Sequence, residues 1–211
     1  MGSPTTLSPG DGAVQAVPGR PDAGAGPATG WTTRLHDGTT THTRLAAAGD
    51  LPSVNALHAR CSQRSLVRRY LTGRRGLSSA EWRALTSPSA GLTWVTQPAD
   101  EPGCVIAVTH VLCAAGTSAR GSGAGPAELA LLVDDGWQSR GLGSELVRRM
   151  VGIARQRGHD ELHALVLAEN RPALALAHLF GAVVVPQGSQ CTVRLTLTRQ
   201  SESSPRRAAA A

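Results

Sequence analysis

Residues 127–143 read AELALLVDDGWQSRGLG, and a segment of helical periodicity follows directly. The apolar run 128–133 has the length of a strand, and residues 134–136 are turn formers. The segment from Gln138 to Gly143 then lies where a helix must begin. A helix start exposes N–H groups that have no partner inside the helix, and it carries the positive end of the macrodipole. Two glycines in this segment let an anion approach those amides closely, so the stretch predicts a pyrophosphate-binding cradle.

Two common nucleotide-binding motifs do not fit this stretch. A dinucleotide-binding fingerprint needs a third glycine, but residue 146 is leucine. A P-loop needs Gly-Lys-Ser/Thr, and the chain contains no lysine. The remaining alternative to a cradle is a glycine-bearing helix start that binds nothing.

Composition predicts one domain between two loose tails. Residues 1–29 are rich in Gly, Pro, Ala, Thr and Ser and lack the apolar side chains that a core needs, so we expect a disordered tail. We expect the domain to span residues 30–199, a second disordered tail to span 200–211, and 114–126 to form a flexible Gly/Ser loop. No signal peptide and no apolar run of about 20 residues stand out, which predicts a soluble, cytoplasmic protein without a membrane partner.

The charged and metal-binding side chains narrow the function classes. The formal charge is +6 and every basic residue other than histidine is arginine, which suits a polyanionic ligand; a coding bias toward arginine is the alternative. Aromatic residues make up only 3% of the chain, so we expect no nucleic-acid partner. Three of the four scattered cysteines stand in apolar segments, which indicates buried, reduced thiols. His159 and His163 start a predicted strand and do not converge, so we expect no metal.

Periodicity and capping signals predict short strands mixed with helices. Asp-Gly at 37–38 marks a hairpin, Asp50 caps a helix, and Ser78 with Glu81 forms a capping box. The expected strands are 33–35, 40–45, 92–96, 104–113, 128–133, 162–167, 182–185 and 192–198. The expected helices are 50–61, 65–71, 78–86, 141–158 and 170–181. This pattern is typical of an α/β domain with a mixed, mostly antiparallel sheet flanked by helices.

The decisive stretch resembles motif A of the GNAT superfamily, the acetyl-CoA-dependent N-acetyltransferases. The resemblance rests on Ala127-Glu128, the apolar run, and Gln138-x-x-Gly141-x-Gly143. A second block of that family resembles residues 170–174 (NRPAL) and 179–182 (LFGA). The resemblance implies the GNAT (acyl-CoA N-acyltransferase) fold over about residues 33–198.

The N-terminal half is similar to the GNAT domain of bacterial protein lysine acetyltransferases. The similar segments are 35–38 (LHDG), 58–62 (HARCS) and 65–70 (SLVRRY). The resemblance implies a primary amine as acceptor, with a protein lysine as the leading class and a small-molecule amine as the alternative. A monomer or a homodimer fits the family equally well.

The resemblance also implies roles for individual residues. Acetyl-CoA would be the cosubstrate, held at its pyrophosphate by backbone amides of Gln138, Ser139, Arg140, Gly141, Leu142 and Gly143, together with Ser144. Leu132 and Val133 would pair with the pantetheine arm through their main chain, and Val133 N–H would stabilise the oxyanion. Asn170 would contact the pantetheine, and the Arg140 side chain would reach a phosphate.

Glu128 is the candidate general base of the reaction. It shares a strand face with Ala130 and Leu132, and relatives with Ala-Glu in this context use the glutamate to remove the amine proton. The alternative is a solvated carboxylate at the sheet edge.

The general acid departs from the family pattern, because the usual tyrosine position is Ala177. Tyr70 is the only tyrosine of the chain, and His178 and His110 are weaker candidates. A non-catalytic domain that binds acyl-CoA is therefore the alternative from a different class.

Overall fold

The computed structural model describes residues 30–113 and 125–197. The tails predicted for 1–29 and 200–211, and residues 114–124 of the predicted flexible loop, lie outside the described residues. No helix within the described ranges has the length and apolar character to cross a bilayer.

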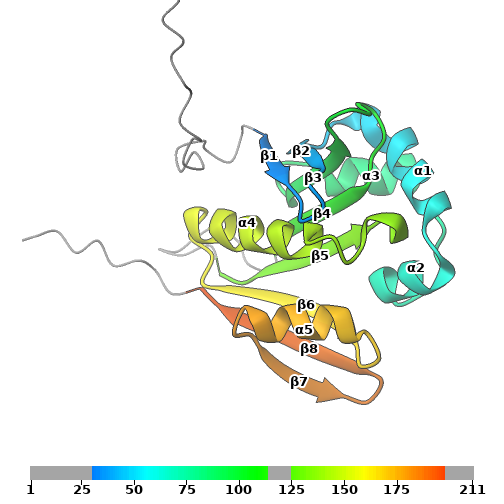
Figure 1. Ribbon diagram of the computed structural model, residues 1–211. Coiled ribbons are helices and arrows are strands. Elements are labelled where there is room, and N and C mark those ends of the chain that lie inside the picture. Colours follow the sequence, from blue (N-terminus) through cyan, green and yellow to red (C-terminus); the bar gives the residue numbers. More distant parts are fainter. Residues whose placement is uncertain (1–29, 114–124, 198–211) are drawn as a thin grey trace, which may run out of the picture.

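One mixed sheet of eight strands runs through the domain in the order β1-β2-β3-β4-β5-β6-β8-β7 (Figure 1). All neighbouring pairs are antiparallel except β5 and β6. This is the mixed, mostly antiparallel α/β sheet that the sequence predicts. The strands are β1 Trp31–Arg34, β2 Thr40–Leu45, β3 Gly91–Pro98, β4 Ala107–Cys113, β5 Ala127–Val133, β6 Glu161–Leu167, β7 Val183–Gln187 and β8 Gln190–Thr196.

Three helices cover one face of the N-terminal half of the sheet (Figure 1). They are α1 (Leu51–Arg60), α2 (Gln63–Tyr70) and α3 (Ser79–Leu85). Their buried side chains form one cluster with residues of β3, β4 and β5, namely Val54, Leu57, Leu66, Trp82, Val95, Val108 and Leu132. Burying these large side chains is the main stabilisation of this layer, at about 25 cal/mol per Å² of apolar surface.

Helix α4 (Leu142–Gln156) lies on the opposite face, and α5 (Arg171–Leu179) lies on the same side over β6, β7 and β8 (Figure 1). The apolar stripe of α4 predicted by the sequence is the buried one, with Leu142, Leu146, Met150 and Ile153 in the core. The α5 layer is smaller and centres on Ala177, Val166 and Val193.

Local signals in the sequence form as expected, with one exception. Asp37 and Gly38 make the β1–β2 turn, and Ser78 and Glu81 form the capping box of α3. Asp50 is the exception, because its side chain makes no cap bond to α1. It accepts instead from Arg44 Nη2 at 2.7 Å and from the amide of Ala47, so it joins β2 to the start of the helical layer.

Two further expectations need correction. Strand β4 begins at Ala107 rather than at Cys104, because Cys104 closes a turn in which its amide donates to the Glu101 carbonyl at 3.2 Å. The cysteines are all free thiols, but Cys104 is only half-buried and Cys113 is exposed.

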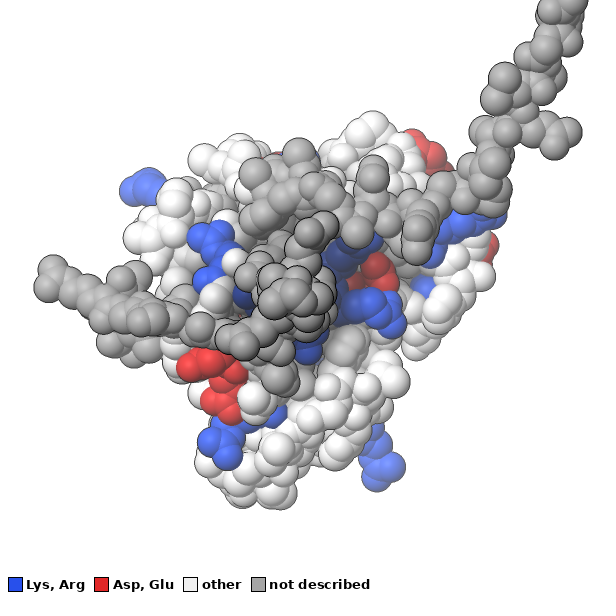
Figure 2. Space-filling view, turned by 90° about the vertical axis from the view of Figure 1, so that its left-hand side faces the viewer, with Lys and Arg blue, Asp and Glu red and all other residues white. Residues whose placement is uncertain are grey.

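Charge on the described surface is mixed. The face in Figure 2 carries arginines in separate groups, with acidic side chains between some of them. Ion pairs on the described residues join opposite charges locally, as between Glu145 and its helix neighbours Arg148 and Arg149.

Two buried histidines predict that the fold loses stability in acid. Burial lowers the pKa of His110 to about 3 and also lowers the pKa of His58. The unfolded chain, with ordinary histidines, therefore binds more protons below about pH 6.5. We expect His110 to contribute a loss of about 1.4 kcal/mol in the free energy of unfolding per pH unit between pH 6 and 4.

Urea unfolding at a series of pH values measures this loss. The variant His110→Gln should have a shallower pH dependence than the wild type. The matched control His178→Gln removes an exposed histidine and should keep the wild-type slope. Equal slopes in the wild type and His110→Gln would show that this histidine is not the source.

Candidate active site

The parallel pair β5–β6 separates soon after it begins. The two strands pair only at Ala127–Leu162 and Glu128–His163, while β6 continues in register with β8. A cavity of about 340 Å³ occupies this divergence, and a second cavity of about 210 Å³ adjoins it. We call the two together the splay groove, because they share the lining residues Arg68, Arg69, Leu131, Asn170, Ala173 and Leu176.

The register of β5 on β4 decides which peptide groups face the splay groove. Opposite residues of an antiparallel pair alternate between those that exchange hydrogen bonds and those that do not. The Asp134 amide donates to the Ile106 carbonyl at 2.9 Å, so Leu132 also bonds to β4. Leu131 and Val133 therefore turn their peptide groups toward the groove. The predicted main-chain role of Leu132 is thus corrected: its peptide group is engaged with β4, and Leu131 takes its place beside Val133.

The predicted cradle is a row of free amides at one end of the groove. The amides from Ser139 to Ser144 have no acceptor in the part of the chain that the structure describes. Ser139 and Gly141 have φ of 61° and 90°, the left-handed geometry that gathers successive N–H groups into an anion-binding concavity. Helix α4 starts at Leu142, so its macrodipole adds positive potential. These amides suit a pyrophosphate, but that of Gln138 donates to the Asp135 carbonyl at 3.3 Å and is less available.

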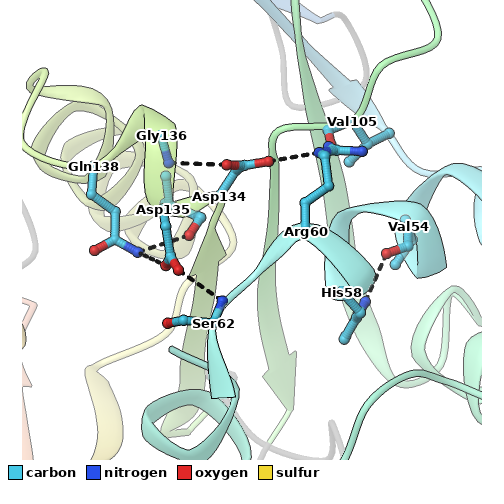
Figure 3. A network of polar contacts seen from close by, with 10 residues as sticks. Val54, His58, Arg60, Ser62, Val105, Asp134, Asp135, Gly136 and Gln138 are labelled. Carbon is cyan, nitrogen blue, oxygen red and sulfur yellow. Dashed lines mark hydrogen bonds and ion pairs between the residues drawn. The ribbon is translucent and has the colours of Figure 1, made fainter. Parts of the chain in front are cut away.

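The side chain of Gln138 braces the cradle (Figure 3). Its Nε2 donates to the Val133 carbonyl at 3.0 Å, to Asp135 Oδ1 at 2.9 Å and to Ser65 Oγ at 3.2 Å. Asp135 also accepts from the hydroxyl of Ser65 and the amide of Ser62, at the start of α2. Burial would raise the pKa of Asp135, but hydrogen bonds from the two serines outweigh it and lower the pKa. Gln138 thus joins the cradle to α2.

A second carboxylate ties α1 to the same turn (Figure 3). Asp134 Oδ2 accepts from Arg60 Nε at 2.8 Å, and Arg60 Nη2 donates to the Val105 carbonyl at 2.6 Å. The other oxygen of Asp134 accepts from the amide of Gly136 at 3.0 Å. The consecutive carboxylates 134 and 135, predicted only as turn residues, therefore fix α1 and α2 to the end of β5.

The β1–β2 turn supports the cradle from outside. The His36 amide donates to the Arg140 carbonyl at 3.4 Å, and Arg140 Nη1 pairs with Asp37 at 3.2 Å. The Arg140 guanidinium also lies 4.8 Å from the centre of the Trp137 ring. The Arg140 side chain, which the sequence resemblance places at a phosphate, thus already contacts Asp37 and Trp137. Gly141 is pressed against the His36 ring, which an added Cβ would meet at 2.8 Å.

The remaining cradle residues divide between core, groove and outer surface. The Leu142 side chain is buried under the sheet, whereas Gly143 lines the splay groove. Ser144 lines a separate polar cavity of about 270 Å³ between β1 and α4. Asn170 caps α5, accepting from the Ala173 amide at 3.4 Å, and it lines both cavities of the groove.

Glu128 lies at the end of the groove remote from the cradle. It faces the α2 side with Ala130 and Leu132, as the alternation predicts, because Leu132 is buried against that helical layer. Arg69 of α2 is near enough for the charge of Glu128 to act on it. Among the residues that line the two cavities, Glu128 is the only acidic one.

Tyr70 and Ala177 line the same cavity from different helices. His58 Nδ1 lies 2.7 Å from the Val54 carbonyl, which only accepts, so this nitrogen carries the proton. His58 Nε2 therefore accepts from the Tyr70 hydroxyl at 2.6 Å, and the rings stack at 5.5 Å. Burial raises the pKa of Tyr70, which keeps the phenol protonated. The hydroxyl proton is directed at His58.

The two histidines predicted as weaker acids are not placed to donate. His178 is exposed and lines none of the cavities described above. His110 is buried, and Thr93 Oγ1 donates to the Leu85 carbonyl while accepting from His110 Nδ1 at 2.9 Å. His110 Nε2 therefore carries no proton in the neutral ring. It has no hydrogen-bond partner among the described residues.

Several solved acetyltransferases share this fold. The GNAT domain of S. lividans PAT is 22% identical over 80% of this chain and 97% of that chain, with a TM-score of 0.70. yncA of Salmonella typhimurium, solved with acetyl-CoA, is 16% identical over 78% and 98%, with a TM-score of 0.60. The ribosomal-protein-S18-alanine N-acetyltransferase of Escherichia coli is 17% identical over 77% and 97%, with a TM-score of 0.55. At these identities the likeness establishes the fold.

Sequence comparison supplies the family. A search of the curated proteins finds no match. The sequence model of the acetyltransferase (GNAT) family matches residues 65–182, which is more than half of the chain and includes β5, the cradle and α5. The chain belongs to the GNAT family of acetyltransferases.

Proposed function

We propose that the protein is an acetyl-CoA-dependent N-acetyltransferase that acetylates a primary amine, with Glu128 as the general base. One observation carries the proposal: a row of free amides opens into a groove whose far end holds a single carboxylate, Glu128. Membership of the family supports acyl transfer from acyl-CoA.

The chain would bind its cosubstrate through main-chain groups. Acetyl-CoA supplies the acetyl group as a reactive thioester. The amides Ser139–Ser144 would hold its pyrophosphate, and the peptide group of Leu131 and the amide of Val133 would pair with the pantetheine. Asn170 would add a side-chain amide from α5.

The distance along β5 favours Leu131 over Val133 as the oxyanion donor. At about 3.3 Å per residue, Val133 lies about 16 Å from Glu128 and Leu131 about 10 Å. The donor and the base must serve the same carbonyl carbon, so the nearer amide is the better choice. This replaces Val133 in the role that the sequence resemblance assigned to it.

Glu128 would start the reaction by taking a proton from the acceptor ammonium. The freed nitrogen lone pair then attacks the thioester carbonyl carbon, and the Leu131 amide stabilises the negative oxygen. The carbon–nitrogen bond forms, the carbon–sulfur bond breaks, and the second proton of the nitrogen leaves on the thiolate. No acid side chain is assigned to that last transfer, because the family's tyrosine position is Ala177.

A non-catalytic domain that binds acyl-CoA is the second candidate function. The hydroxyl of Tyr70, which lines the cavity opposite Ala177, is directed at His58 and not at the groove. A cradle without a general acid would still bind the cofactor. Within the first candidate, the acceptor is either a protein lysine or a small-molecule amine.

The variant Glu128→Gln tests the assigned base. It keeps the shape of the side chain but removes the proton acceptor, so we expect about 10²-fold lower kcat, in the range known for lost general bases. The rate of coenzyme A release from acetyl-CoA with a panel of small amines and lysine peptides measures it. Thermal stabilisation by coenzyme A should not change.

Glu101→Gln, in the exposed β3–β4 turn, is the matched control and should keep wild-type turnover. Undiminished turnover in Glu128→Gln would remove this residue from the mechanism. Firm acetyl-CoA binding with no turnover on any amine would instead favour the non-catalytic domain.

The variant Gly141→Ala tests the cradle. Alanine is strained at a φ of 90°, which disturbs the cradle backbone, and its Cβ would lie 2.8 Å from the His36 ring unless that ring moves. We expect at least tenfold weaker coenzyme A binding by calorimetry. Gly152→Ala lies in the same helix with open space around it and should bind normally. Normal binding by Gly141→Ala would show that the amides are not the anion site.

A further inference from the structure

Arg68 and Arg69 line both cavities of the splay groove, and the proposed mechanism gives neither a task. Both residues belong to α2, which packs beside β5 on the face of the sheet toward which Glu128 points. In the described part of the chain neither forms an ion pair, and the buried Nε of each has no hydrogen-bond partner. Buried donors without partners are costly, so two adjacent ones in a ligand groove call for an explanation.

Arg69 lies further along α2 than Ser65, the residue of this helix that contacts the cradle. Ser65, one turn earlier in α2, contacts Gln138 at 3.2 Å. Arg69 lies four residues further along, about 6 Å toward the other end of the groove. There it is near Glu128 and lies over the Tyr70 ring, with its guanidinium carbon 4.7 Å from the ring centre. Arg69 thus lines the cavity that holds Glu128 as well as the one that Ser139 and Gly143 line, and its place in α2 shifts it toward the Glu128 end.

The charges around Arg69 favour an incoming anion. Burial lowers the pKa of the Arg69 guanidinium, the charge of Glu128 raises it, and Arg74 lowers it again. An arginine nonetheless stays protonated in proteins. The groove lining therefore holds two arginines against one glutamate, and His163 at its edge is already paired with Glu161 at 2.5 Å. A simple ammonium ion would enter a site with surplus positive charge, whereas an amine with its own negative group would balance it.

We infer that the acceptor is a small amine that carries a carboxylate, and that Arg69, assisted by Arg68, binds this carboxylate while Glu128 receives the amine. The inference rests on the proposed function and specifies its substrate class. A guanidinium offers a planar pair of N–H donors that matches a carboxylate, and the buried Nε is one donor of that pair. A lysine inside a peptide chain has no carboxylate of its own and would leave both arginines unpaired.

Paired acceptors test the substrate class. Coenzyme A release is measured with the twenty L-amino acids, β-alanine and γ-aminobutyrate, each beside its carboxamide. For at least one pair we expect the acid to have a kcat/KM about 10- to 100-fold above that of its amide, as for the loss of a charge-assisted bidentate contact. Equal rates for acid and amide throughout, or a blocked lysine peptide that outperforms every amino acid, would overturn the inference and leave acetyl transfer intact.

Variants in α2 test whether Arg69 binds the carboxylate. Arg69→Gln should abolish the preference for acid over amide without changing the KM for acetyl-CoA, and Arg69→Lys should keep part of it. Arg64→Gln, on the exposed side of the same helix, is the matched control and should keep the preference. A raised KM for acetyl-CoA in Arg69→Gln, with the acid preference unchanged, would make Arg69 a phosphate ligand and overturn the assignment.

A binding measurement separates this inference from the proposed function. Thermal unfolding is recorded with coenzyme A present, with each amino acid or its amide added at equal concentration. Stabilisation by an acid but not by its amide, lost in Arg69→Gln, would support the carboxylate site even if no amine releases coenzyme A. Equal shifts, or none, would overturn it.

Discussion

The architecture depends on one interrupted pairing. Strand β5 forms a complete ladder with β4 but only two parallel pairs with β6, which pairs fully with β8 instead. Peptide groups within a sheet seldom stay unpaired, and here the peptide group of Leu131 and the amide of Val133 face a groove, while the Val133 carbonyl accepts from Gln138. An extended ligand that supplies amide groups would complete the sheet. The two parallel pairs lie at the Glu128 end, so the cradle and the carboxylate are at opposite ends of the gap.

Consecutive carboxylates hold α1 and α2 to the end of β5, on the N-terminal side of this gap. Asp134 binds Arg60 of α1, and Asp135 binds Ser62 and Ser65 at the start of α2. The same turn leads into the cradle, and Gln138 joins the same network. The turn that leads into the cradle therefore also fixes the position of α2, the helix that carries Arg68 and Arg69.

Local signals allowed much of this fold to be predicted from the sequence. The Asp-Gly turn, the capping box of α3, the apolar stripe of α4 and the Asn170 cap are set by neighbouring residues, and each is present. The features that could not be predicted are those that contacts with distant strands or helices determine. The resemblance implies a main-chain role for Leu132, whereas the phase of hydrogen bonding on β5 depends on its register with β4. The pairing of Arg140 with Asp37 could not be predicted either, because the two residues stand about one hundred positions apart in the sequence. The meeting of Arg69 with Glu128 is likewise a product of tertiary packing.

Gly141 has a place in this structure before any ligand is considered. Its left-handed backbone favours glycine, and an added Cβ would meet the exposed His36 ring of the β1–β2 hairpin at 2.8 Å. A chain with this loop that bound no cofactor would have the same preference for glycine at this position. The glycine of the motif therefore reports the shape of the loop, and evidence for catalysis in this fold has to come from residues that the scaffold itself does not require.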